Sequence, residues 1–394
     1  YILYVLDLYK FLIMFSSSWG FLKRHKRKFV IGSIIVSSVI FLTRYTQRKL
    51  QEWQDNEIRM LMEKTKKRQY YENIEKTCNQ MTLSLAATLR NSVIKENDTE
   101  TIINQLRDGT ANKIVSWNQL KILAFTRSAV IIYSYTMLAT FLRIQITLIS
   151  GHMYKNAQNV DNGIIENEVQ EKYMTLSSYF IYESIKNLNN LIKSKIVEVT
   201  ASLSLTEQLT LRDLEQIYWA LTSSISTDSL KDPVKNFTSY ILQKNTENND
   251  TSIYKKLIDQ MLDVIESEEV QDLMQKNIRS GFVLLMDHIS MYFNNSSKIS
   301  NIYEARDATS HSKESNIKNS TSTLQDATMN DESNEFVNIN KTTMALAKII
   351  PIINGQVPDN PTPKDIAADW LQHLILNSEL KILGANIYEA FSCS

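Results

Sequence analysis

Glycine and proline are scarce throughout this chain, and their scarcity limits the folds open to it. Eight glycines and five prolines occur among 394 residues, whereas leucine, isoleucine, lysine, glutamate and asparagine are frequent. Architectures built from β-strands need many turns, and turns rely on glycine and proline. The composition therefore predicts an all-α fold, in which long helices pack as an elongated bundle.

The charged residues balance, with 43 basic and 43 acidic side chains and no net charge. A nucleic-acid-binding protein usually shows a basic footprint, so we expect no nucleic-acid partner. The two cysteines, Cys78 and Cys393, cannot form a disulfide scaffold and suit a reducing compartment such as the cytosol. Cys78 lies on an apolar segment, where we expect a free core cysteine rather than a nucleophile.

The N-terminal region carries an uncharged run between two basic clusters. Residues 29–43 are fewer than the ~20 needed to span a bilayer, but flanking Lys and Arg side chains extend the effective span. We therefore predict a single transmembrane anchor at residues 29–45, with a buried core helix or a signal sequence as the alternative. Residues 1–13 precede the first methionine and are interpreted as an upstream or gene-model extension. Residues 14–28 form a basic targeting segment with Lys23, Arg24, Lys26, Arg27 and Lys28.

The segment NKIVSWNQLKILAFTRS, residues 112–128, opens the most apolar stretch of the chain. Ser116 and Gln119 match a capping box, which predicts a helix start at Ser116 with Trp117 in its first turn. Residues 129–142 are apolar on nearly every face, which favours the central helix of a bundle. A second membrane span is the alternative for that run.

Trp117 itself has two interpretations. It is either ordinary core packing or the anchor of a docking surface, because a large aromatic side chain at a helix start need not be buried. Lys113 and Lys121 flank it in the sequence. The residues alone leave the two interpretations equally open.

Further helical segments alternate with polar ones along the rest of the chain. A short helix within 96–113 should close at Gly109. Residues 294–343 are rich in Ser, Asn, Thr and Asp and cannot repay the entropy of ordering, so we predict a disordered insert. Pro351 should interrupt the apolar run after it. More helices are expected at 165–200, 204–226, 251–293 (a pair) and 364–391, so residues 46–394 should form one helical bundle domain.

Motifs of common catalytic sites do not occur. The sequence contains no glycine-rich nucleotide loop, no H-E-x-x-H, no C-x-x-C and no G-x-S-x-G. The five histidines are scattered, and His288 lies among apolar residues, where we expect a satisfied core histidine rather than a metal ligand. We expect no catalytic residue, metal or cofactor, and a receptor or scaffold rather than an enzyme.

Five motifs are distributed along the chain in a fixed order: FLKRHKRK at 21–28, TCN at 77–79, NKIVSWNQLKILAFTRS at 112–128, LAKIIPIINGQ at 346–356 and ANIYEAFS at 385–392. These motifs resemble those of the peroxin-3 family of peroxisomal membrane biogenesis proteins. The resemblance covers roughly residues 14–393. The chain departs from the family pattern at 1–13 and 294–343, neither of which contains a matched motif.

The resemblance implies a single-pass receptor of the peroxisomal membrane whose bulk, residues 46–394, faces the cytosol. It implies docking of peroxin-19, the soluble chaperone that delivers peroxisomal membrane proteins for insertion and peroxisome assembly. The partner would present an amphipathic helix to a groove, and lysines around the groove would favour an acidic partner. The matched groove residues are Trp117, Leu106, Lys113, Leu120, Lys121 and Lys348, and the match favours docking for Trp117.

Two points remain open beside this interpretation. The family also implies possible tethering of peroxisomes to cytoskeleton or autophagy adaptors, which is the alternative function. Membrane orientation is the second point, because five basic residues precede the uncharged run at 29–43 and three, Arg44, Arg48 and Lys49, follow it. The positive-inside rule alone would place the N-terminus in the cytosol, whereas the resemblance implies the reverse, with contact to peroxisomal membrane lipids through the anchor.

Overall fold

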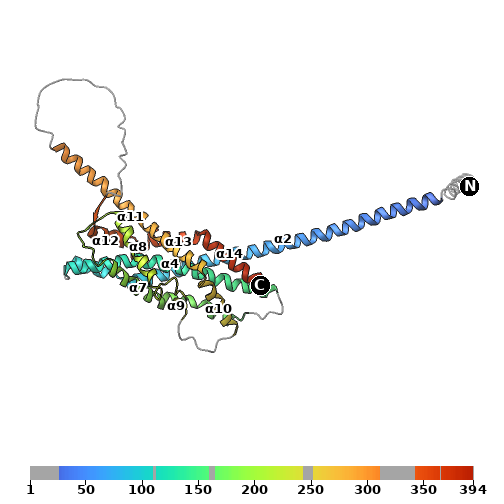
Figure 1. The fold of residues 1–394 in the computed structure, drawn as a ribbon, viewed down its shortest axis with the longest axis horizontal. Coiled ribbons are helices and arrows are strands. Elements are labelled where there is room, and N and C mark those ends of the chain that lie inside the picture. The colour runs from blue at the N-terminus through green and yellow to red at the C-terminus, as the bar shows by residue number, and fades with distance from the viewer. Residues whose placement is uncertain are drawn as a thin grey trace, which may run out of the picture. The chain divides into compact units, whose positions relative to one another are not determined.

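The computed structural model describes residues 26–109, 112–158, 165–242, 252–310, 342–363 and 365–393, and it confirms the predicted all-α fold (Figure 1). Side chains are described within these ranges from residue 37 onward, except at 158 and 294–310. The elements in chain order are α2 (Lys26–Glu96), α3 (Glu100–Asp108), α4 (Lys113–Gln158), α5 (Asn167–Met174), α6 (Leu176–Tyr179), the π-helix η1 (Phe180–Ser184), α7 (Ile185–Val199), β1 (Gln208–Leu209), α8 (Leu211–Thr227), α9 (Thr238–Ile241), α10 (Ser252–Ile265), α11 (Glu268–Ser310), β2 (Met344–Ala345), α12 (Leu346–Asn354), α13 (Ile366–Leu376) and α14 (Ser378–Cys393).

The chain divides into two units, residues 1–72 and 73–394. In the first unit, α2 contains the predicted anchor, and every described side chain from 37 to 45 is exposed. The predicted extension at 1–13 lies outside the described residues, as do Lys23 and Arg24. Lys26, Arg27 and Lys28 form the first turn of α2.

Helix α4 is the centre of the second unit. It packs against α3, α7, α10, α11, α12, α13 and α14, and every residue from 124 to 151 is buried. Of the described helices, Lys113–Ala157 alone is long and apolar enough to cross a membrane, but 89% of its most apolar window is buried inside the protein. The burial supports the central-helix interpretation over a second membrane span.

Buried arginines attach α4 and the end of α2 to the segment before α13. The Arg127 guanidinium donates to the Asn97 carbonyl at 2.6 Å and the Val357 carbonyl at 3.0 Å, and it pairs with Asp359 at 2.8 Å. Arg90 pairs with Asp365 at 3.3 Å. Each buried charge thus has a counter-charge and backbone acceptors, which offset its desolvation.

The predicted start of α4 is wrong by one turn. The helix begins at Lys113 rather than Ser116, because the Asn112 side-chain oxygen accepts from the Ile114 amide at 3.1 Å. The Ser116 amide already donates to the Asn112 carbonyl at 3.0 Å, and Ser116 is buried rather than placed at a cap. A capping box does occur at the start of α8, between Thr210 and Asp213. Trp117 therefore lies in the second turn of α4.

Three other boundaries differ from the prediction. The backbone of α11 continues as a helix to Ser310, into the segment predicted as a disordered insert, while 311–341 lies outside the described residues. Pro351 lies inside α12, which continues through it to Asn354. The last predicted helix is two helices, because the Asn377 side-chain oxygen accepts from the amides of Glu379 (2.9 Å) and Leu380 (3.0 Å) and begins α14.

Candidate docking surface

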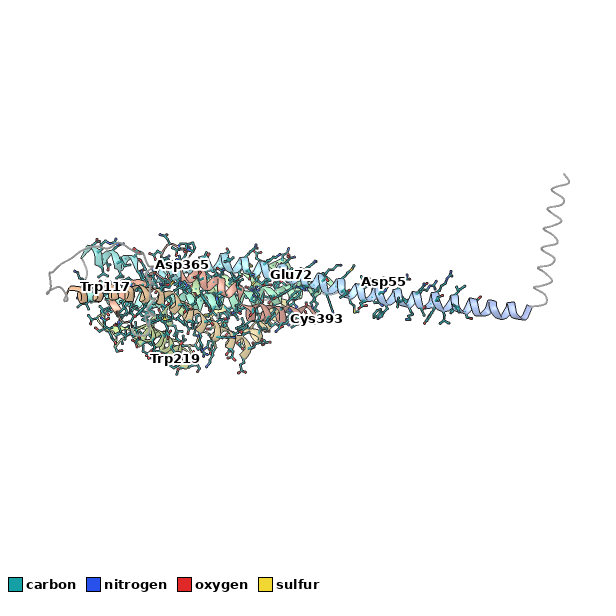
Figure 2. All side chains as sticks on the ribbon, turned by 90° about the horizontal axis from the view of Figure 1, so that it is seen from above. Asp55, Glu72, Trp117, Trp219, Asp365 and Cys393 are labelled. Carbon is teal, nitrogen blue, oxygen red and sulfur yellow. The ribbon has the colours of Figure 1, made fainter. Side chains whose placement is uncertain are left out.

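The residues predicted to bind a partner lie mainly where α3 meets the start of α4. Helix α3 ends at Gly109, which has a φ of 69° and supplies the left-handed conformation that closes the helix. Helix α3 then packs against α4. Leu106 and Trp117 are half-buried on these two helices, and Lys113 is exposed in the first turn of α4. Trp117 lies at one end of the helical bundle (Figure 2).

Two apolar residues beside Trp117 were not predicted as part of the site. Ile114 is 67% exposed and Val115 is 51% exposed. The predicted helix start at Ser116 left both residues outside the helix. With the start at Lys113, these side chains belong to the exposed first turn of α4. We call Leu106, Lys113, Ile114, Val115 and Trp117 together the Trp117 patch.

Lys121 does not lie where the prediction placed it. Its side chain is only 5% exposed, and its Nζ donates to the carbonyls of Thr200 and Leu203, each at 3.1 Å. Burial lowers the pKa of the Lys121 ammonium, partly offset by Glu207. Leu120 is also buried. The ammonium group is used inside the protein, so Lys121 fixes the loop after α7 to α4 instead of lining the patch as an exposed charge.

Lys348 lies on α12, which is hydrogen-bonded to the same loop after α7 that Lys121 holds. It is exposed on α12, and the neighbouring amides of Leu346 and Ala347 donate to the carbonyls of Glu207 and Leu205, each at 2.9 Å. The loop from 200 to 207 therefore bonds to α4 on one side and to α12 on the other. Lys113 and Lys348 form no ion pair within the described residues.

The other side chains singled out in the sequence are satisfied inside the fold. Cys78 is buried and free, and burial raises the pKa of its thiol. His288 is mostly buried, with its Nε2 2.9 Å from the Asp369 carboxylate, as expected for a core histidine. No group of three or more His, Cys, Asp or Glu residues within the described ranges is arranged to hold a metal ion.

An all-helical fold with a half-buried tryptophan beside exposed aliphatic side chains at one end of its bundle is typical of a protein that binds other proteins. The chain belongs to the peroxin-3 family, whose model matches residues 20–116 and 152–390. The matched segments contain Leu106, Lys113 and Lys348. Trp117, Leu120 and Lys121 fall in the stretch between the two segments.

Mammalian relatives match over nearly the whole chain. The chain is 28% identical to the peroxisomal biogenesis factor 3 of Rattus norvegicus over 399 residues, which cover 96% of this chain and 98% of the rat protein. It is also 28% identical to the Homo sapiens protein of that name, with the same coverage. The peroxisome biogenesis protein 3-1 of Arabidopsis thaliana is 22% identical, over 68% of this chain and 82% of the plant protein. The chain therefore has a role in peroxisome biogenesis.

Proposed function

We propose that the Trp117 patch docks peroxin-19 and that the chain is the peroxisomal membrane receptor for this chaperone and its membrane-protein cargo. The supporting observation is the half-buried Trp117 at one end of the bundle, next to the exposed Ile114 and Val115. An amphipathic helix that laid its apolar face here would cover Trp117 and Ile114, which are three residues apart and lie on one face of α4. Aromatic residues at the centre of such a contact commonly dominate the affinity.

The charges around the patch favour an acidic partner. Lys113 is exposed beside Ile114, and Lys348 is exposed on α12. Charges at the rim of an interface act mainly on the association rate. Lys121 contributes to the site indirectly, because its two hydrogen bonds hold the loop that also bonds to α12.

Membrane attachment belongs to the same proposal. Residues 29–45 would span the peroxisomal membrane, residues 23–28 would target the chain to it, and residues 46–394 would face the cytosol. The support is a helical backbone with exposed apolar side chains, among them Val39, Phe41 and Leu42. Bilayer hydrocarbon would remove these side chains from water, and an α-helix satisfies its own backbone hydrogen bonds there.

The test is binding of peroxin-19 to Trp117→Ala, measured by isothermal titration calorimetry on the full chain in detergent. Loss of a central aromatic anchor should cost about 2–4 kcal/mol, which is a loss of roughly 30- to 800-fold in affinity. Trp219→Ala is the matched control, because Trp219 is an exposed tryptophan on another side of the bundle (Figure 2). Wild-type affinity in Trp117→Ala would refute the site. A tethering role at another surface would survive this substitution.

A further inference from the structure

A groove lies between α8 and α11, with a cavity volume of about 530 Å³. Its floor is aromatic: Tyr218 and Phe282 are buried there, with their ring centroids 5.1 Å apart. The two helices run in opposite directions. This orientation is evident from an adjoining hollow, which is lined by Ser226, near the end of α8, and by Gln275, near the start of α11. The rims are formed by Arg212, Glu215 and Trp219 on α8 and by Arg279, Val283 and Asp287 on α11.

The middle of the groove exposes large apolar side chains from both helices. Trp219 is 73% exposed and Val283 is 61% exposed. Covering such side chains contributes roughly 25 cal/mol per Å² of apolar surface removed from water, so a visiting apolar residue would be stabilised here. The groove is separate from the Trp117 patch, since Trp219 lies on the side of the bundle and Trp117 at its end (Figure 2). No residue of the Trp117 patch lines it.

The charges on the rims are segregated along the groove. Arg279 stands at one end, next to the adjoining hollow, and Glu215 and Asp287 stand with Arg212 at the other end. None of the four forms an ion pair among the residues that the structure describes. Eight residues of helix separate Arg279 from Asp287, which is about 12 Å along the axis. The exposed charge at one end of the groove is therefore the positive Arg279, beside the buried Asp232 of the adjoining hollow, whereas the exposed charges at the other end sum to a net negative charge.

This pattern selects the kind of partner. An anionic membrane surface would meet Glu215 and Asp287 as repulsive charges. A helix about three turns long can instead place an acidic residue beside Arg279, apolar residues on Trp219 and Val283, and a basic residue beside Glu215 and Asp287. Acidic residues near the N-terminus of a helix and basic ones near its C-terminus also suit its dipole. The visiting helix would thus run parallel to α11.

We propose that the α8–α11 groove binds an amphipathic helix of a second protein partner, with an acidic N-terminal end, an apolar centre and a basic C-terminal end. The docking follows the helix-in-groove mode. It is independent of the peroxin-19 proposal, because the two sites use different tryptophans on different surfaces. Either site can fail its test without affecting the other.

The test uses a fluorescent synthetic peptide of about 15 residues, a length of about four helical turns. It has glutamates at its N-terminal end, leucines at i, i+3 and i+4 in the centre, and lysines at its C-terminal end. The control peptide has the same composition with glutamates and lysines exchanged. Fluorescence anisotropy with the full chain in detergent should show binding of the first peptide at least about tenfold tighter than the second. Equal binding of the two, or no binding of the first, would overturn the proposal.

Variants locate the contact. Trp219→Ala should weaken binding of the first peptide by at least about tenfold. Arg279→Glu should reduce or reverse the preference for the first peptide over the control peptide. Trp117→Ala should change neither the affinity nor the preference. Circular dichroism checks that each variant folds, and we expect Trp219→Ala to fold normally because Trp219 is exposed. Val283→Asp, on α11, is a second groove variant and should weaken binding of the first peptide to the same extent. Unchanged binding of the first peptide in both Trp219→Ala and Val283→Asp contradicts the proposal. A concentration-dependent dimer that Trp219→Ala abolishes in analytical ultracentrifugation would assign the groove to a second copy and overturn it too.

Discussion

At the scale of single residues, Lys121 is a buried charge that stabilises the fold next to the proposed docking surface. Its ammonium donates to the Thr200 and Leu203 carbonyls and is shielded from water. Lys121→Ala would leave two carbonyls without their donor, so we expect a loss of about 1–3 kcal/mol in the free energy of unfolding. Urea denaturation measures this loss. The exposed Lys113→Ala, two turns earlier, should change the stability by less than about 0.5 kcal/mol, and equal stability of the two variants would show that Lys121 is not a structural group.

Asp232 is a second buried charge with a measurable consequence. It is almost fully buried, and one of its carboxylate oxygens accepts from the Val234 amide at 2.9 Å. Burial raises the pKa of this carboxyl, against the lowering effect of that hydrogen bond. Because the folded-state pKa lies above the unfolded value of about 3.9, the folded protein favours the protonated form. The protonated carboxyl therefore contributes its full stability below the unfolded-state pKa, and this contribution is lost as the pH rises through the folded-state pKa.

Asp232→Asn removes the titration and keeps an oxygen for the Val234 amide. The free energy of unfolding of this variant, minus that of the wild type, should therefore increase as the pH is raised from about 4 toward neutral. Urea midpoints measured across that range give the difference. A difference that stays constant with pH would mean that Asp232 has the same pKa in the folded and unfolded states.

At the scale of elements, Gly281 sets the approach of α11 to α4 and α13. A Cβ built at Gly281 would lie 2.6 Å from Ile132 Cγ2 and 3.0 Å from Trp370 Cε2. Helix propensity alone would make Gly281→Ala stabilising by about 1 kcal/mol. Overpacking costs typically ~1–3 kcal/mol, and both neighbours are fully buried, so we expect net destabilisation. Thermal denaturation measures the change in stability, with the adjacent Ser280→Ala as the control. A raised unfolding midpoint in Gly281→Ala would show that α11 can move away from α4 and α13 at little cost in free energy.

The element boundaries show what the sequence could and could not predict. Helix α4 was identifiable because it contacts protein on all sides, and its side chains are accordingly apolar on all faces. Gly109 marked the end of α3 as predicted, whereas proline was a less reliable marker of helix ends. Pro351 is exposed near the end of α12 and does not break that helix, whereas Asn377, which no pattern marked, divides the last helical segment by capping α14. These outcomes depend on tertiary surroundings that local propensity does not contain.

The candidate docking surface was predictable only in part for the same reason. Trp117 and Lys113 were predicted near a helix start and lie there, half-buried and exposed respectively. The exposure of Ile114 and Val115 follows from a cap at Asn112, which no sequence pattern marked. Lys121 looks like any surface lysine in the sequence, because its carbonyl partners lie about eighty residues away, after α7. The α8–α11 groove depends on two helices that are distant in the sequence, and no local pattern marked it.

At the scale of the whole molecule, the membrane orientation is the point on which two arguments disagree. Five basic residues precede the uncharged run at 29–43 and three follow it, so the positive-inside rule would place the N-terminus in the cytosol. The peroxin-19 proposal requires the opposite, because the Trp117 patch lies in residues 73–394 and a soluble chaperone must reach it. The rule describes insertion by the translocon, and a chain inserted directly into another membrane need not follow it.

Protease treatment of intact peroxisomes carrying a C-terminally tagged chain decides between the two. We expect the tag and the helical bundle to be digested without detergent, while a peroxisomal matrix protein in the same sample stays intact until detergent is added. A tryptophan-to-alanine change at Trp117 should leave this pattern unchanged, because docking and orientation rest on different parts of the chain. Protection of residues 50–394 in intact organelles would reverse the orientation, and the Trp117 patch would then be out of reach of any cytosolic chaperone.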